Sequence, residues 1–310
     1  MRVLALSVFG LSILASPALA QAPPAGPLVL QVPATPRTAA LGNAWVAGRD
    51  QDVLFYNPAQ IVNARTGFDL SYTHHGPDAG MVTMGSVYAS GKWSMTFGWG
   101  AEILRFGADP FASGPLSTHA LHMHGSAEGV SALFAVGGAI VFKGFRIGAA
   151  GKYVFDSVPA SGAGSGTATP LRGALVADIG ASRNLWGGTF AGSVQNLGPH
   201  AANGSALALP RQTLVGWSMT RGAGPIDLGL YTQLTMRHDW TAPGAGLEAG
   251  YSWIEGYNVA LRVGVRRPET TTEKPVSLGA AFTADRLTVE YAVQIFDGGH
   301  AAQGVTFRWR

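Results

Sequence analysis

The sequence predicts an all-β protein, a transmembrane antiparallel β-barrel of about fourteen strands with an N-terminal plug-like segment. Three observations support this prediction: the composition, a two-residue periodicity and the pattern at the N-terminus. Of 310 residues, 13% are charged, 47% are hydrophobic and 43 are glycine. An ordinary soluble domain carries roughly 25% charged residues, whereas a helical membrane protein would be far more apolar than this chain. A barrel with a small-residue interior fits both values.

The composition also excludes several classes of site. The chain has no cysteine, which rules out a disulfide framework, a thiolate metal site and a cysteine nucleophile. The formal net charge is only +3 and is scattered along the sequence, which is not typical of a nucleic-acid-binding protein.

Residues 1–20 have the pattern of a secretory signal peptide. Arg2 precedes the apolar run 3–14, and the small-residue site Ala18-Leu19-Ala20 follows, so we expect cleavage near Ala20. The apolar run is too short to span a bilayer as a helix. Residues 21–36 are rich in proline and alanine and are expected to form an extended leader.

Residues 37–64 do not alternate and are expected to form a plug-like segment. A short helix over 38–47, broken near Gly42, is one expected element. A second helical turn is expected to begin with Asn57 as N-cap and Pro58 at its first position. The segment is either a simple lead-in beneath the barrel or a plug that folds back into its mouth.

From residue 67 to the end, apolar residues alternate with small or polar ones. In the run 286–296, one face would carry Leu287, Val289, Tyr291, Val293 and Ile295. A strand segregates these residues onto one face, whereas a helix would spread them around its circumference. The opposite faces are mostly Gly, Ala, Ser and Thr. A soluble sandwich would crowd its outer face with Lys and Glu, so a transmembrane barrel with a small or polar lumen fits better.

The alternation predicts fourteen strands in one barrel domain, 67–310. The expected spans are 67–75, 80–90, 92–102, 129–143, 145–158, 172–185, 188–198, 211–221, 225–239, 245–255, 257–267, 275–284, 286–297 and 300–310. Tight turns such as Lys143-Gly144 alternate with longer loops such as 103–128. Bacterial barrels have short periplasmic turns and longer outer loops, so both ends of the barrel are expected in the periplasm.

Several short motifs resemble those of a known family. Arg37-x-x-Ala40-Leu41-Gly42-x-Ala44, then Asp50, Asp52 and Phe55-Tyr56-Asn57-Pro58-Ala59, resemble the opening signature of the PorV/PorQ and FadL-like outer-membrane barrels. The stretches 192–199 with Leu209-Pro210-Arg211, and 277–292 through to the chain end, resemble the PorV/PorQ branch. The family has fourteen strands, in agreement with the count from periodicity.

The resemblance implies an outer-membrane location and a choice between two functions. The leading interpretation is a PorV/PorQ-like component or scaffold in protein export by type IX-like secretion, with secretion-machinery proteins as partners. The alternative is a FadL-like passive channel for small hydrophobic molecules, which the short outer loops of this chain disfavour. In either case the resemblance implies a plug motif made of Arg37, Gly42, Asp52, Asn57, Pro58 and Ala59.

Charged residues on the expected lumen face carry both signs. They are Glu102, Lys152, Asp178, Asp227, Arg237, Glu248, Arg262, Glu290 and Arg308, with Arg310 at the chain end. The favoured interpretation is a set of ion pairs that brace the barrel and seat the plug. A charged constriction that selects solutes is the alternative.

No site for catalysis, a metal or a cofactor is expected. His119, His122 and His124 have spacing that could suit a metal, but they fall in a Gly/Pro-rich loop. His238-Asp239 is the best acid–base pair, yet adjacency in a strand sends the two side chains to opposite faces. The sequence contains no G-x-S-x-G nucleophile motif, and an enzyme is therefore disfavoured.

Overall fold

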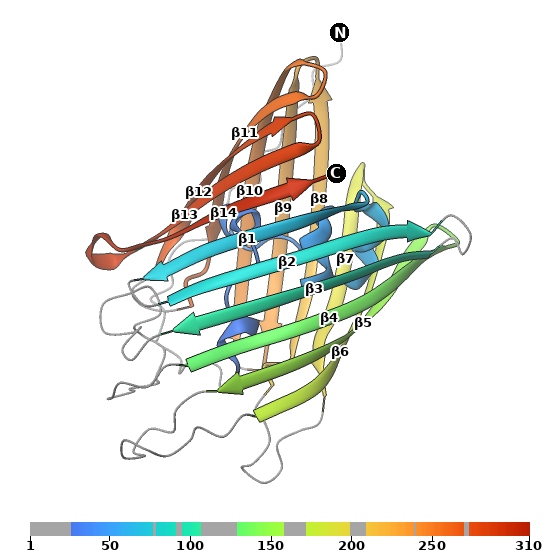
Figure 1. Ribbon diagram of the computed structural model, residues 1–310. Helices are drawn as coiled ribbons and strands as arrows, with labels where there is room; N and C mark the ends of the chain where they lie inside the picture. The colour runs from blue at the N-terminus through green and yellow to red at the C-terminus, as the bar shows by residue number, and fades with distance from the viewer. Residues whose placement is uncertain are drawn as a thin grey trace.

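The computed structural model describes residues 26–76, 79–90, 95–106, 129–157, 172–198, 209–238, 240–269 and 273–310. These residues form a closed antiparallel β-barrel around an N-terminal segment (Figure 1). Its strands are β1 (Gly67–Gly76), β2 (Ala79–Ser90), β3 (Met95–Phe106), β4 (Gly129–Phe142), β5 (Phe145–Ser157), β6 (Arg172–Leu185), β7 (Gly188–Leu197), β8 (Gln212–Ala223), β9 (Ile226–Arg237), β10 (Trp240–Ile254), β11 (Tyr257–Arg266), β12 (Glu273–Ala284), β13 (Leu287–Phe296) and β14 (Ala301–Trp309).

Every strand pairs with its neighbours in the sequence, and β1 closes the barrel by pairing with β14. The closing register runs from Phe68 opposite Trp309 to His74 opposite Gln303. Full closure leaves no free sheet edge, so every strand in the wall has a partner on each side. The predicted fold class, a fourteen-stranded antiparallel barrel, is confirmed.

Two-residue turns at one end of the barrel explain its tight hairpins. Lys143 and Gly144 have φ of 49° and 80°, and Trp186 and Gly187 have φ of 52° and 74°. Positive φ at both central residues matches the right-handed twist of the flanking strands. This end also holds the start of β1 and the end of β14, and it is called the short-turn end below; the opposite end is the loop end.

Burial alternates along the strands as the sequence predicts. In β13, Thr288 and Glu290 are buried inside the barrel, whereas Tyr291 and Ile295 are exposed on its outer surface. The outer face of the barrel carries large apolar side chains on every part of the wall, including Phe68, Phe134, Tyr153, Leu175, Leu228, Leu261 and Phe307. Among the described residues, no helix is long and apolar enough to cross a membrane.

Two strand boundaries differ from the expected ones by more than three residues. Strand β10 begins at Trp240, five residues before the expected start, and therefore includes Pro243. Proline cannot donate a hydrogen bond to a strand ladder. Here only the carbonyl of Pro243 is needed, and it accepts the N–H of Arg267 at 3.0 Å. Strand β3 ends at Phe106 rather than 102, because β2 and β4 pair with it along that length.

The N-terminal segment, residues 26–64, lies inside the barrel (the blue chain in Figure 1). It contains η1 (Leu28–Leu30), α1 (Pro36–Ala40), η2 (Gln51–Phe55) and η3 (Pro58–Asn63). The expected helix over 38–47 is corrected to α1, because a Thr35–Thr38 capping box starts the helix earlier and Gly42, at φ 63°, follows its end. Residues 26–36 are not a separate leader, since Leu28 and Val29 are buried. The signal peptide and residues 21–25 lie outside the described residues.

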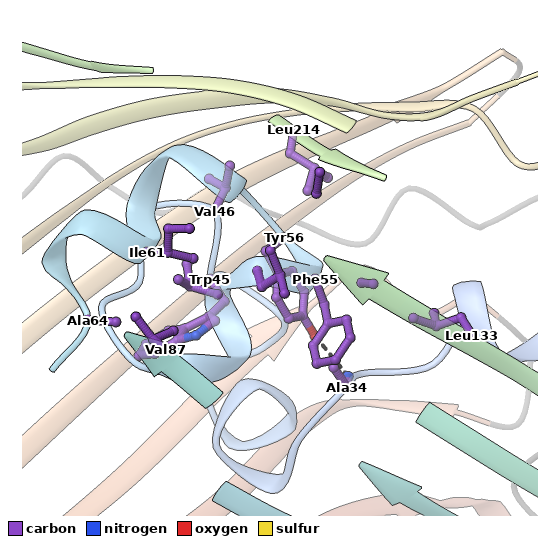
Figure 2. Packing of buried hydrophobic residues seen from close by; sticks show 14 of the residues in the cluster. Ala34, Trp45, Val46, Phe55, Tyr56, Ile61, Ala64, Val87, Leu133 and Leu214 are labelled. Carbon is purple, nitrogen blue, oxygen red and sulfur yellow. Dashed lines mark hydrogen bonds between the residues drawn. The ribbon is translucent and has the colours of Figure 1, made fainter. Parts of the chain in front are cut away.

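The main hydrophobic core joins this segment to the inner wall. Figure 2 shows Trp45, Phe55, Tyr56 and Ile61 from the segment close to Val87, Leu133 and Leu214 from the wall. The Trp45 ring lies 5.3 Å from the ring of Tyr231 on β9. The interior is therefore filled largely by the chain's own N-terminus.

Candidate functional site

A recess of glycines in the inner wall receives the N-terminal segment. A Cβ on Gly264 of β11 would lie 2.1 Å from the amide nitrogen of Gly42. A Cβ on Gly279 of β12 would lie 2.6 Å from the Cβ of Ala40. Real side chains essentially never approach so closely, so the absence of Cβ atoms at this part of the wall lets the end of α1 contact the strands directly. The predicted motif residue Gly42 therefore lies at a backbone-to-wall contact.

A buried charge cluster, consisting of Arg37, Asp50, Glu248, Arg262, Glu290 and Arg308, joins the segment to the wall. The Arg37 Nη2 lies 2.9 Å from Glu248 Oε2, and the other terminal nitrogen of Arg37 pairs with Asp50. On the wall, Arg262 pairs with Glu248 at 2.5 Å and with Glu290 at 2.9 Å. Carboxylates of β10 and β13 are thus shared between a wall arginine and an arginine of the segment.

Arg308 of β14 joins the same cluster, because it contacts one carboxylate of the segment and one of the wall. Its Nη1 lies 3.1 Å from Asp50 Oδ2 and 3.1 Å from Glu290 Oε1. Arg310 adds a contact of 2.7 Å to Asp50, and the carboxylate of Asp69 lies 3.7 Å from Arg308. Such a buried network is costly to break, because removing one partner leaves an uncompensated charge.

The pKa values of two carboxylates of the segment are shifted in opposite directions. Burial opposes the charge of Asp50, but Arg308, Arg37 and Arg310 outweigh it and hold the pKa of Asp50 well below its ordinary range. Burial instead raises the pKa of Asp52 above its ordinary value. Asp52 accepts hydrogen bonds from the Thr35 hydroxyl at 2.6 Å and from the Trp45 indole N–H at 2.9 Å. Asp50 is therefore an ion-pair partner, whereas Asp52 orders α1 and Trp45.

The Asn57-Pro58-Ala59 motif starts η3 against strands β5 and β6. The Asn57 side chain accepts the N–H of Ala59 at 3.0 Å and donates to the carbonyl of Val46 at 3.1 Å. The predicted N-cap at Asn57 and Pro58 at the first position are both observed. A Cβ on Gly148 would lie 2.5 Å from the Ala59 nitrogen, so this motif also lies directly on the wall.

On the loop side of the segment, side-chain amides bind its backbone. Gln195 of β7 donates to the carbonyls of Phe55 at 2.7 Å and Tyr56 at 2.8 Å. The side-chain oxygen of Gln195 accepts a hydrogen bond from the side-chain amide of Gln212. The side-chain oxygen of Gln212 in turn accepts one from the Nε–H of Arg237 at 3.0 Å. Arg237 also pairs with Glu269 at 3.2 Å. A polar chain therefore runs from the segment to the loop end.

A second buried ion pair lies on the opposite wall. The Lys152 ammonium is 2.6 Å from Asp178 Oδ2, and both side chains are almost fully buried. Asp178 Oδ1 also accepts the N–H of Asn196, which has φ 58° at an irregularity in the β6–β7 register. Glu102 is buried nearby on β3.

A cavity on the loop side of the segment has an amphipathic lining. Its volume is about 60 Å³, and it is partly open to solvent. Its apolar wall includes Leu30, Leu133, Leu214 and Trp240, and its polar wall includes Gln195, Gln233, Arg237 and Arg266. A separate hollow at the short-turn end, lined by residues such as Arg65, Arg286 and Arg310, shares no lining residue with it. The N-terminal segment lies between the two.

The structure places most of the predicted lumen charges in the interior. Buried or partly buried there are Glu102, Lys152, Asp178, Arg237, Glu248, Arg262, Glu290, Arg308 and Arg310. Asp227 differs, because it lies next to the β8–β9 turn and is exposed. Of the motif residues, Arg37, Gly42 and Asp52 gather around α1 and the charge cluster, whereas Asn57, Pro58 and Ala59 contact the opposite wall.

Sequence reasoning missed Asp69, Gln195 and Gln233. Gln233 accepts the N–H groups of Trp45 and Val46 at 3.0 and 2.8 Å. A long amide at an inward strand position was the available signal for Gln195 and Gln233. His119, His122, His124 and Asp239 lie outside the described residues. Within the ranges that the structure covers, no group of three or more His, Asp or Glu residues is arranged to hold a metal ion.

Comparison with known proteins identifies solved structures that share this fold. No protein-family model matches the sequence, and no curated protein is detectably similar to it. Among solved structures, the toluene transporter TbuX of Ralstonia pickettii is similar, with a TM-score of 0.56 and 11% identity over 89% of this chain and 98% of that one. The Pseudomonas putida toluene transporter TodX has a TM-score of 0.51 and 11% identity over 87% and 96%. The chain therefore shares the barrel fold of these toluene transporters.

Proposed function

We propose that this protein is an outer-membrane channel for the passive entry of small hydrophobic molecules. The observation that carries the proposal is the amphipathic cavity on the loop side of the N-terminal segment. Leu30, Leu133 and Leu214 offer a small apolar solute an apolar surface beside polar groups, and burying apolar area there is favourable. Pockets for small ligands are concave and combine apolar side chains with polar groups that fix the ligand's orientation.

The shared fold supports this proposal over protein export. TbuX and TodX are toluene transporters, and both are similar in fold to this chain over almost their whole length. Nothing in the comparisons favours the PorV/PorQ interpretation, which stays a prediction. The outward apolar belt supports a membrane location, and the order of turns and loops supports an orientation with the short-turn end in the periplasm.

In this proposal the N-terminal segment is the plug. Its hydrogen bonds to Gln195 and Gln233, together with the charge cluster, hold it across the lumen. A solute in the cavity faces Phe55 and Tyr56 of the segment, so passage requires the segment to shift or the solute to leave by another route. In this proposal the charged residues of the lumen hold the plug in place through ion pairs and do not select solutes.

The proposal is tested by uptake of a hydrophobic fluorescent probe, phenylnaphthylamine, into cells whose outer membrane contains the protein. We expect faster uptake than in cells without it and no acceleration of a hydrophilic sugar. The variant Leu133→Trp/Leu214→Trp, which fills the cavity, should remove most of the gain. The matched variant Phe134→Trp/Val215→Trp changes the neighbouring outward positions and should preserve it. Equal uptake by the wild type and the cavity-filled variant would contradict the proposal.

A further inference from the structure

The outer face of β5–β8 carries an unusual row of side chains near the short-turn end. The backbone register places Phe145 opposite Arg183, Arg183 opposite Phe190, and Phe190 opposite Trp217. Phe145 and Phe190 are exposed on the outer surface, at 42% and 39%. An arginine therefore lies within an aromatic row on the face that the barrel presents to lipid.

Two further cations flank this row, and together with Arg183 they are called the basic rim: Lys143, Arg183 and Arg221. Lys143 occupies the β4–β5 turn, with its ammonium 5.3 Å from the centre of the Phe142 ring. The Arg183 guanidinium lies 4.7 Å from the centre of the Phe145 ring. Arg221 reaches the β6–β7 turn, because a Cβ on Gly187 would lie only 2.6 Å from its Nη2.

In the part of the chain that the structure describes, no carboxylate balances the basic rim. Within the described residues, none of its three cations forms an ion pair. In 129–157, 172–198 and 209–224, the only acidic residues are Asp156, at the loop end of β5, and Asp178, which is buried with Lys152. Asp227, just beyond the β8–β9 turn, has the inward position of its strand. At the loop end, by contrast, Arg237, Arg266 and Lys274 each pair with a carboxylate.

Trp186 marks the depth of the basic rim. It is 82% exposed in the turn that joins β6, which carries Arg183, to β7, which pairs with the Arg221 strand β8. Exposed tryptophan is typical of the level where lipid headgroups meet the hydrocarbon core. At that level the negatively charged group available to an unpaired cation is the phosphate of a lipid.

We propose that the basic rim binds anionic phospholipid headgroups in the leaflet at the short-turn end. The row Phe145, Phe190 and Trp217 contacts the part of the acyl chains nearest the headgroups. Arg183 and Arg221 donate hydrogen bonds to phosphate oxygens. Arginine suits this role because its fork of N–H donors matches phosphate. Lipid is favoured over an acidic protein, because Arg183 is set among lipid-facing aromatics rather than in the mouth of the barrel. This inference is independent of what the lumen transports.

The test reconstitutes the full-length mature protein in phosphatidylcholine vesicles that contain a trace of acyl-labelled phosphatidylglycerol. Energy transfer from tryptophan to the label measures lipid enrichment around the barrel, and equally labelled phosphatidylcholine gives the baseline. Each cation near a membrane surface contributes about a fivefold preference for anionic lipid. Arg183→Gln/Arg221→Gln should therefore lower the phosphatidylglycerol preference at least about tenfold, and Arg183→Lys/Arg221→Lys should retain a large part of it.

The matched control is Arg65→Gln/Arg286→Gln, which removes the same charge from the hollow inside the short-turn end. It should leave the preference nearly unchanged. An equal loss in the control would show a general effect of net charge and overturn the proposal. Absence of any preference in the wild type would also overturn it, as would displacement of the lipid by inorganic phosphate or by soluble polyglutamate at equal concentration.

Discussion

At the residue scale, Gly264 shows how a single missing Cβ permits the N-terminal segment to contact the wall. A Cβ at this position would lie 2.1 Å from the Gly42 nitrogen, a backbone atom that cannot rotate away. We expect Gly264→Ala to push α1 from the wall at a cost of about 1–3 kcal/mol, as over-packing usually does. Limited proteolysis of residues 37–64 in the folded barrel measures this loosening as a faster cleavage rate.

The control for this change is Gly151→Ala, on the same barrel. A Cβ on Gly151 would meet nothing within 4 Å, so the protease resistance of the segment should remain as in the wild type. Resistance that is unaffected by Gly264→Ala would mean that the contact between Gly42 and β11 does not hold the segment.

A second prediction at this scale concerns pH and Asp52. Burial raises the pKa of Asp52 in the seated segment above the value that the residue has in water. The seated state therefore binds the proton more tightly, and its stability falls as pH rises from the ordinary range of a carboxyl through the raised pKa. Proteolysis of the segment should accelerate over that window, and Asp52→Asn should flatten the dependence. Asp50 has a lowered pKa, so its ion pairs should persist until more acidic pH.

At the scale of single elements, η3 depends on one cap. Asn57 accepts the Ala59 N–H and donates to Val46, so it joins the start of η3 to the preceding loop. Asn57→Ala should destabilise the seated segment by about 1–2 kcal/mol through loss of the cap and the second bond. Asn63→Ala, at the other end of η3, removes a bond to Gln60 only and should cost less. Equal effects in chemical denaturation would show that the cap has no special role.

The elements also show how far the sequence determines the fold. Strands such as β13 were predictable, because Leu287 to Phe296 alternate strictly between outward-facing and interior residues. The start of β10 was not, since Pro243 cannot donate to a ladder, and the strand is extended there by pairing of residues 240–243 with 234–237 of β9. The path of residues 26–36 inside the barrel was also beyond local reasoning. It depends on contacts such as Val29 N–H to Ser131 Oγ at 3.3 Å, between residues far apart in the sequence.

The same distinction holds for the candidate site. Inward charges such as Glu290 and Arg308 could be predicted, because their parity in the strand assigns them to a face. Their partners could not, since Arg37 and Asp50 come from a segment without periodicity. Which carboxylate pairs with which arginine follows from the closed barrel and from how the segment lies in it.

At the scale of the whole molecule, the charge cluster divides into two balanced parts. The segment contributes one cation, Arg37, and one anion, Asp50. The wall contributes its own cations and anions, which include the direct pairs of Arg262 with Glu248 and Glu290 and the contact of Arg308 with Glu290. Removing the segment therefore leaves no net charge unmatched on the wall. The continuous ladder from β1 to β14 does not pass through the segment either.

A barrel that lacks residues 21–64 should therefore still close but lose its plug. We expect the deletion protein to keep the shifted mobility of a folded barrel on unheated gels. In planar bilayers it should conduct ions, whereas the intact protein stays closed, because Phe55, Tyr56 and Ile61 no longer fill the lumen. Arg37→Gln removes the ion pairs of Arg37 with Asp50 and Glu248. This variant should open briefly, with an average conductance between that of the intact protein and that of the deletion protein. A deletion protein that folds but remains closed would show that wall side chains alone seal the lumen, and the plug role of the segment would then be wrong.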